Sequence, residues 1–163
     1  MSVVHTFDEF AAALDAMKVP HRAILASREI ELQGGTSLPG PIIFRWEKNV
    51  PFVTVRQYVL DDVAADRLTD LERAVTRVNH HLEVPGFGLD HLRRRVYFKL
   101  AAPVFLGIDV DTLNRLAKGV LANAKEFAAS FQAVASGRPG AEIAEIYKDY
   151  AQSRAAHFFS EGS

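Results

Sequence analysis

Basic and aromatic residues alternate with apolar ones in one short segment of the chain. Every second position from residue 93 to residue 99 is basic or aromatic, which gives the set Arg93, Arg95, Tyr97 and Lys99. Val96 and Phe98 fall between the later members of this set. Because successive side chains of a strand point to opposite faces of a sheet, the spacing predicts a strand with one apolar face and one cationic, aromatic face.

A second segment, from Phe52 to Val59, repeats this pattern. If the valines at positions 53, 55 and 59 face the core, the opposite face receives Phe52, Thr54, Arg56 and Tyr58. Arg45, in the segment before, is a further candidate for the same face. We therefore predict a partner-binding sheet face that consists of Arg45, Phe52, Arg56, Tyr58, Arg93, Arg95, Tyr97 and Lys99.

Three interpretations of this face are open at the level of sequence. Rings that stack on bases and cations that contact phosphates are typical of proteins that bind single-stranded nucleic acid. A face of this kind also suits an acidic protein partner. The third interpretation, which is the most frequent in proteins, is a half-open antiparallel sheet whose outer face is solvated or covered by another helix or a second subunit.

The histidines do not have the spacing of a metal site. His80 and His81 are adjacent, so on a helix their side chains diverge, whereas a metal-binding helical pair needs a spacing of four residues. Asp90 and His91 could approach from the next hairpin. A histidine near the C-terminal end of a helix is already favoured by the helix dipole, so we predict no metal site.

No segment has the pattern of a catalytic or phosphate-binding motif. Gly34-Gly35 and the pair Gly86 and Gly88 lack the lysine and the strand-to-helix setting of a phosphate-binding loop. The serines are not in a Gly-x-Ser-x-Gly setting, and we expect Asp61-Asp62 to cap the start of a helix. The sequence therefore predicts a protein that is not an enzyme and has no cofactor.

Composition limits the class of protein. The 163 residues are 48% hydrophobic and carry a net charge of -1, which fits one domain and gives no global attraction to polyanions. The absence of cysteine removes disulfides and thiolate chemistry. The N-terminal residues lack the basic start and apolar run of a signal peptide, and no apolar run is long enough for a membrane span. We expect a cytoplasmic protein without a membrane partner.

The hydrophobic periods give the order of the elements. Helical spacing predicts helices at about 7–17, from 62 or 69 to 82, 109–134 and 141–158, and alternation predicts strands at about 21–32, 42–47, 52–59, 87–91 and 94–100. The order is α-β-β-β-α-β-β-α plus an extra C-terminal helix. It predicts an α+β fold of two layers, in which an antiparallel five-stranded sheet has helices on one face.

The C-terminal helix is expected to dock on another surface. It has an apolar stripe that includes Ile143, Ile146, Tyr147 and Tyr150. Such a stripe must be covered by the chain's own sheet, by a second subunit or by another protein, and packing on its own core is the simplest of these. We therefore divide the chain into a domain at 1–136 and a linker, helix and short tail at 137–163.

The core of the chain resembles the YbjN-like family of bacterial sensory transduction regulators. The resemblance rests on a helix that reaches Asn79, the glycines of the 86–90 segment, the strand at 96–100 and the helix that begins near Asp111, and it covers about residues 6–135. It implies a fold similar to that of class I type III secretion chaperones, often homodimeric, without catalytic residues. Asn79 matches a frequent helix-terminal Asn of the family, which we expect to end the helix.

Two functions follow as hypotheses, beside a third, a sensor of a small ligand between sheet and helices, which needs a cavity there. The first is a non-enzymatic, chaperone-like or regulatory domain that binds a protein partner and forms a homodimer. The alternative is a nucleic-acid-associated accessory protein that uses the basic and aromatic sheet face. Secretion chaperones of this fold tend to be acidic. The near-neutral charge of this chain does not match that of a chaperone for secreted effectors.

Overall fold

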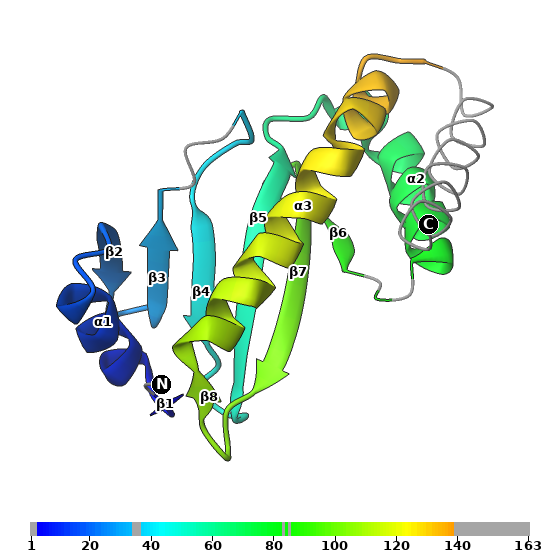
Figure 1. The fold of residues 1–163 in the computed structure, drawn as a ribbon. Helices are drawn as coiled ribbons and strands as arrows, with labels where there is room; N and C mark the ends of the chain where they lie inside the picture. The colour runs from blue at the N-terminus through cyan, green and yellow to red at the C-terminus, as the bar shows by residue number, and fades with distance from the viewer. Residues whose placement is uncertain (1–2, 34–36, 83, 85, 139–163) are drawn as a thin grey trace, which may run out of the picture.

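The computed structural model describes residues 3–33, 37–82, 84 and 86–138. The predicted C-terminal helix, with Ile143, Ile146, Tyr147 and Tyr150, lies outside the described residues, so its docking stays a prediction. The described part forms an α+β fold in which helices lie in front of one face of a sheet (Figure 1).

The main sheet has six antiparallel strands in the order β2-β3-β4-β5-β7-β6. Their bounds are β2 His21–Ile24, β3 Glu29–Leu32, β4 Ile42–Trp46, β5 Phe52–Leu60, β6 Phe87–Asp90 and β7 Arg95–Pro103. A separate antiparallel pair joins β1, Val3–Val4, to β8, Ile108–Asp109. The sequence did not predict this pair, since two residues are too few to show a period.

The prediction of five strands in the sheet was wrong by one. The segment at 21–32 forms two strands, because the chain reverses at residues 25–28. Arg28 adopts a left-handed conformation with φ of 54°, and its N–H donates to the carbonyl of Leu25 at 3.2 Å. Ile30 of β3 is fully buried. The neighbouring strand β2 is the edge of the sheet and has no large buried side chain.

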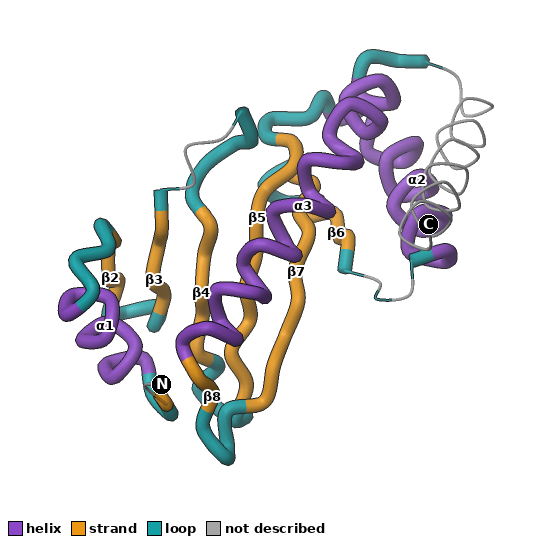
Figure 2. Tube along the Cα trace, viewed as in Figure 1, coloured by secondary structure: helices purple, strands orange, loops and turns teal. Residues whose placement is uncertain are grey.

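Among the described residues, three α-helices lie on the inner face of the sheet, which is the face that carries the apolar core (Figure 2). They are α1 Phe7–Ala16, α2 Leu68–His81 and α3 Val110–Ala135. A short 3₁₀ turn at Ala65–Arg67 leads into α2, so the helix begins at neither of the two predicted positions, Asp62 and Thr69. None of the described helices is both long and apolar enough to cross a bilayer.

Aromatic contacts fix the helices on the inner face. Phe10 of α1 packs on the ring of Phe44 at 5.1 Å and on that of Trp46 at 5.3 Å, both from β4. Phe87 of β6 lies 5.2 Å from the ring of Phe127 of α3. Each of these rings is almost fully buried, so the helices cover this face along its width.

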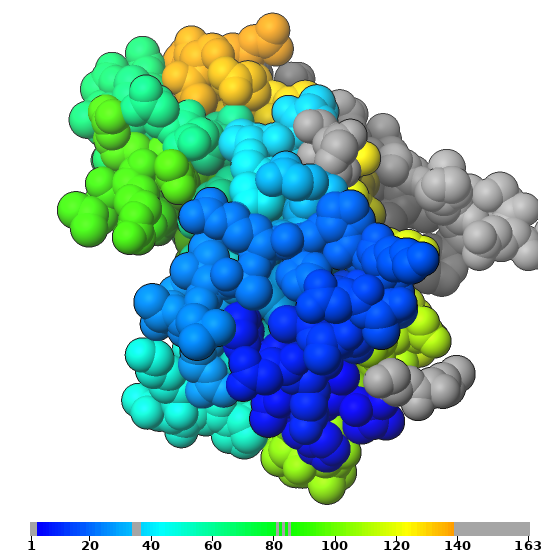
Figure 3. All heavy atoms as spheres, turned by 90° about the vertical axis from the view of Figure 1, so that its left-hand side faces the viewer, coloured from blue at the N-terminus to red at the C-terminus, as the bar shows by residue number. Residues whose placement is uncertain are grey.

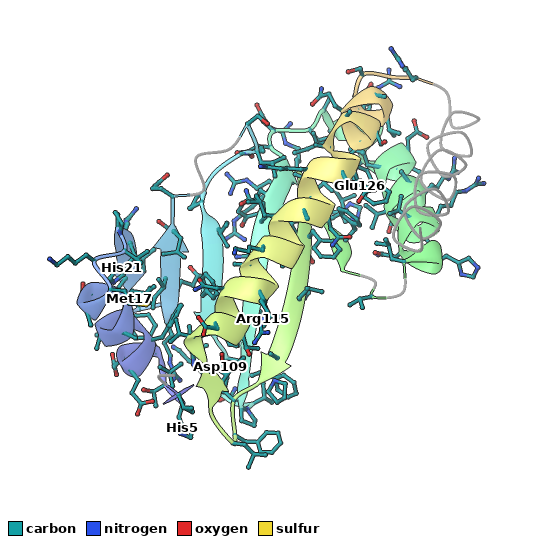
Figure 4. The ribbon with its side chains drawn as sticks, viewed as in Figure 1. His5, Met17, His21, Asp109, Arg115 and Glu126 are labelled. Atoms are coloured by element: carbon teal, nitrogen blue, oxygen red, sulfur yellow. The ribbon has the colours of Figure 1, made fainter. Side chains whose placement is uncertain are left out.

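The long helix α3 begins where the sequence predicts. Asp109, labelled in Figure 4, is the N-cap residue, and its side chain accepts a hydrogen bond from the Thr112 N–H at 2.8 Å. Its other carboxylate oxygen accepts from the Thr112 hydroxyl at 2.5 Å. These bonds, the hydroxyl one first, hold the pKa of the Asp109 carboxyl below its ordinary value.

Candidate binding surface on the outer face of the sheet

The outer face is the side of the six-stranded sheet that none of the described helices covers. In β5 the predicted alternation holds: Val53 and Val55 are fully buried, whereas Arg56 and Tyr58 are partly exposed. In β7, Val96 and Phe98 are buried, whereas Arg95, Tyr97 and Lys99, which alternate with them, are not. The alternation in these two long strands therefore places the basic and aromatic residues on the outer face, as predicted.

The register between β5 and β7 brings these side chains together in a row. Tyr58 lies opposite Tyr97, and Arg56 lies opposite Lys99. The guanidinium of Arg56 is 5.2 Å from the ring of Tyr58 and 5.9 Å from that of Tyr97. The Arg95 guanidinium lies 5.0 Å from the Tyr58 ring, and the Lys99 ammonium lies 5.9 Å from the Tyr97 ring. Five of the eight predicted residues thus form one cation–π cluster, which consists of Arg56, Tyr58, Arg95, Tyr97 and Lys99.

Carboxylates on the same face offset much of the positive charge. Arg95 donates to Asp61 at 2.7 Å, which raises the pKa of the guanidinium further above its ordinary value. Glu29 lies 4.0 Å from Arg45 and 3.8 Å from Arg56. The outer face is therefore a surface of mixed charge, which local spacing does not reveal because Glu29 and Asp61 contact basic residues of distant strands.

Three predicted residues lie at the margins of the cluster. Phe52 is at the far end of β5, opposite Pro103, and is 39% exposed. Arg45 is on β4, opposite Thr54. Arg93 lies in the turn before β7, not in the strand, so the strand alternation does not place it.

The turn that contains Arg93 is held by Asp90. The Arg93 N–H donates to one carboxylate oxygen of Asp90 at 3.0 Å, and its guanidinium donates to the other at 3.3 Å. The backbone bond is the main reason that the pKa of the Asp90 carboxyl is below its ordinary value. Two hydrogen bonds therefore engage Arg93 within its own hairpin.

Asp61 and Asp62 do not cap a helix, contrary to the prediction. Asp62 has a left-handed backbone with φ of 51° and binds Arg94 at 2.5 Å, while Asp61 binds Arg95. The Val63 N–H also donates to the Arg94 carbonyl at 3.0 Å. The two acids therefore connect the end of β5 to the turn before β7, a contact between distant segments that local spacing does not reveal.

Asn79 has a different role from the predicted one. It lies within α2, two residues before the helix ends, so it does not terminate the helix. Its amide donates to the Phe87 carbonyl at 2.8 Å and accepts from the N–H groups of Gly86 and Phe87 at 3.2 and 3.0 Å. Asn79 therefore fastens α2 to the beginning of β6.

The structure also shows an exposed apolar end that the sequence analysis overlooked. Phe105 and Leu106, between β7 and β8, are 62% and 81% exposed, and Val50, between β4 and β5, is 51% exposed. Figure 3 shows these two connections, yellow-green and cyan, at one end of the molecule, where Figure 4 also labels His5. A run of apolar residues at 104–106, outside any strand or helix period, was the available signal.

The described residues bring no set of three or more acidic or histidine side chains together in a way that could hold a metal ion. His91, one of the candidate ligands, lies 3.7 Å from Glu72 of α2. Both side chains are more than half exposed. This is the geometry of a surface ion pair.

Comparison with known proteins shows that the chain has the fold of a solved structure. No family model matches the sequence, and no curated protein matches it. The chain is similar to the crystal structure of YbjN from E. coli, a proposed transcription regulator, with a TM-score of 0.59 over 79% of this chain and 96% of that chain. Sequence identity is 10%, so the similarity concerns the fold alone. The predicted YbjN-like fold is confirmed.

Proposed function

We propose that this chain is a non-enzymatic regulatory domain of the cytoplasm that binds a protein partner through the outer face of its sheet. One observation carries the proposal: the described helices pack on the inner face, while Tyr58, Tyr97 and three cations form a partly exposed cluster on the outer one. Tyrosine and arginine are enriched at protein interfaces, tyrosine because its ring is large and rigid, and arginine because its planar guanidinium has five donors.

The mixed charge of the outer face favours a protein over a polyanion. Glu29, Asp61 and Asp90 lie among the basic groups and would repel closely spaced phosphates. A protein surface can present both signs of charge and match this pattern. A regulatory role is also compatible with the fold of YbjN, itself a proposed transcription regulator.

Nucleic acid is the second candidate, because Tyr58 and Tyr97 form an aromatic pair beside Lys99, and bases can stack on exposed rings. In the structure, however, Arg56 and Arg95 already lie near these rings. The two candidates differ in salt dependence. Contacts to phosphates weaken steeply as salt concentration rises, whereas an interface with buried aromatic groups keeps most of its affinity.

The test compares two variants that lose the same charge from different surfaces. Arg56→Ala/Lys99→Ala alters the outer face, and Arg77→Ala/Lys118→Ala alters exposed positions of α2 and α3. Immobilised full-length protein should retain a specific partner at about 0.3 M salt. Only the outer-face variant should lose it. Equal loss in both variants, or retention of nucleic acid alone at low salt, would contradict the proposal.

A homodimer is part of the proposal, and the exposed apolar end supports it. Phe105 and Leu106 are exposed side by side, and clustered exposed apolar groups mark interfaces. Light scattering of the full-length protein should give twice the monomer mass. Leu106→Ser should shift the mass toward the monomer. Leu92→Ser is the matched control, since Leu92 is 89% exposed in the turn before β7. A monomer mass for the unaltered chain would exclude the dimer.

A further inference from the structure

A cavity of about 550 Å³ opens on the outer face, beside the cation–π cluster. Its volume is within the range of about 300 to 1,000 Å³ that is typical of small-molecule sites. The β4 and β5 strands form one part of the wall through Ile43, Arg45 and Arg56, and the loop Pro39–Pro41 forms another. The cavity is therefore built from a sheet and a loop.

Two guanidinium groups in the cavity have incomplete hydrogen bonding. The guanidinium groups of Arg45 and Arg56 form no hydrogen bond with any described residue, and their nearest carboxylate oxygens lie 3.8 to 4.0 Å away. The Nε of Arg56 is buried without a partner. An arginine has five N–H donors, so both groups retain donors for an additional acceptor.

The carboxylate of Glu29 lies between the two guanidinium groups, and that of Glu47 lies 3.8 Å from Arg45. Its Oε1 is 4.0 Å from Arg45 and 3.8 Å from Arg56, while its Oε2 accepts from the Ser27 hydroxyl at 2.9 Å. Arg95, in contrast, is engaged by Asp61 at 2.7 Å, and Arg93 by Asp90. The guanidinium donors of the cavity that lack hydrogen bonds are thus concentrated at Arg45 and Arg56.

The remaining walls favour an apolar body. Ile43 and the prolines at 39 and 41 give apolar surface, and the Tyr58 ring is within reach of Gly40, where an added Cβ would lie 3.9 Å from the ring. The loop is held from the core side, because the Gln57 amide donates to the Pro39 carbonyl at 2.9 Å. The apolar wall is therefore a fixed part of the site.

We propose that this cavity binds a small organic acid, with its carboxylate on Arg45 and Arg56 and its apolar body against Ile43, the prolines and Tyr58. A carboxylate matches the planar donor pattern of a guanidinium. The acids Glu29, Glu31 and Asp61 also line the cavity, so a singly charged ligand meets less repulsion than phosphate would. This site goes beyond the protein-binding role and does not depend on it.

The test is a titration of full-length ¹⁵N-labelled protein with benzoate, followed by amide chemical shifts. Benzoate should saturate at millimolar concentration and shift the amides of residues 40, 42–45 and 56–58. Benzamide, the neutral isostere, and phosphate should each bind at least ten-fold more weakly. These three titrations need no variant, so a folding defect cannot obscure them.

Two variants have opposite expected effects. Arg56→Gln should weaken benzoate binding at least ten-fold, whereas Glu29→Gln should strengthen it about three-fold or more, because it removes a competing carboxylate. Arg77→Gln, exposed on α2, should leave the affinity unchanged. Weaker binding in Glu29→Gln would overturn the proposal.

A further titration separates a free acid from an acidic peptide. A capped dipeptide of Phe and Glu presents the same carboxylate on a peptide backbone. If the dipeptide binds and benzoate does not, the cavity is a docking site for a protein side chain, and the small-acid proposal fails. Equal affinity for benzoate and phosphate, or no localised shifts at all, would also overturn it.

Discussion

The two faces of β5 and β7 differ although the same two strands form both. On the inner face, Val55 and Phe98 are at most 1% exposed and pack under α3. On the outer face, Tyr58 and Tyr97 are partly exposed and lie against cations. Alternate residues of one strand therefore stabilise the fold and form a candidate binding surface, so changes at neighbouring positions should have separable effects.

Polar groups also differ between the faces. The inner side has few of them, and they act locally: Gln57, fully buried, holds the loop before β4, and Asn79 holds β6. The outer face has many, and they form ion pairs around Glu29, at 3.8 to 4.0 Å, and around Asp61, at 2.7 Å. Buried polar groups are costly unless they are bonded, whereas exposed pairs contribute little to stability.

The sharpest test of this comparison changes two adjacent residues of β7. Phe98→Ala should lower the free energy of unfolding by about 3 to 5 kcal/mol, because it leaves a cavity beside Phe87. Tyr97→Ala should cost about 1 kcal/mol, since its ring is already partly in water. Urea unfolding, followed by circular dichroism, measures both values.

A different result would contradict this comparison of the two faces. If Tyr97→Ala costs as much as Phe98→Ala in the full-length protein, the outer face is covered in solution. The candidate binding surface would then be part of the core.

The next largest effect is expected at Asn79. Asn79→Ala removes three hydrogen bonds between α2 and β6 and leaves partly buried backbone groups unpaired, which should cost about 2 to 3 kcal/mol. Asn79→Asp keeps the acceptor and loses the donor, so it should cost less. Hydrogen exchange of the Phe87 amide should accelerate in Asn79→Ala and change less in Asn79→Asp, which keeps the acceptor of this N–H. An unchanged exchange rate of the Phe87 amide in Asn79→Ala would mean that other contacts hold β6.

Asn79 also shows what sequence can and cannot predict. The alternation in 52–59 and 95–99 fixed which residues face the core, because the period of a strand is a local property. The partners of Asn79, Asp61 and Glu29 depend on the register between distant segments, which no local pattern contains. The two-strand reversal at Arg28 was missed because its turn has no glycine or proline signal.

A smaller effect is expected at Gln57, the polar residue on the core side of β5. Gln57→Leu loses the bonds to the Pro39 and Tyr58 carbonyls but also removes a buried Oε1 that has no partner. The two changes offset each other, so stability should change by no more than about 1 kcal/mol. The loop at 39–41 should become more mobile, and benzoate binding should weaken several-fold. A large loss of stability would show that Gln57 supports the core itself.

The smallest effect concerns the charge of Asp90 at the margin of the outer face. The Arg93 N–H holds the pKa of this carboxyl below its ordinary value of 3.8, so the charged form stabilises the fold above about pH 4, and this contribution is lost as pH falls through the folded-state pKa. Asp90→Asn keeps an acceptor for the N–H but lacks the charge. At pH 7 it should be less stable by under about 1 kcal/mol, because the pair is partly exposed. In urea unfolding, the difference should shrink as pH falls through the folded-state pKa of Asp90, because the carboxyl then becomes neutral like the amide. A difference that is constant from pH 7 to pH 3 would show that the hairpin depends on side-chain shape, and that charge on the outer face has no part in stabilising the fold.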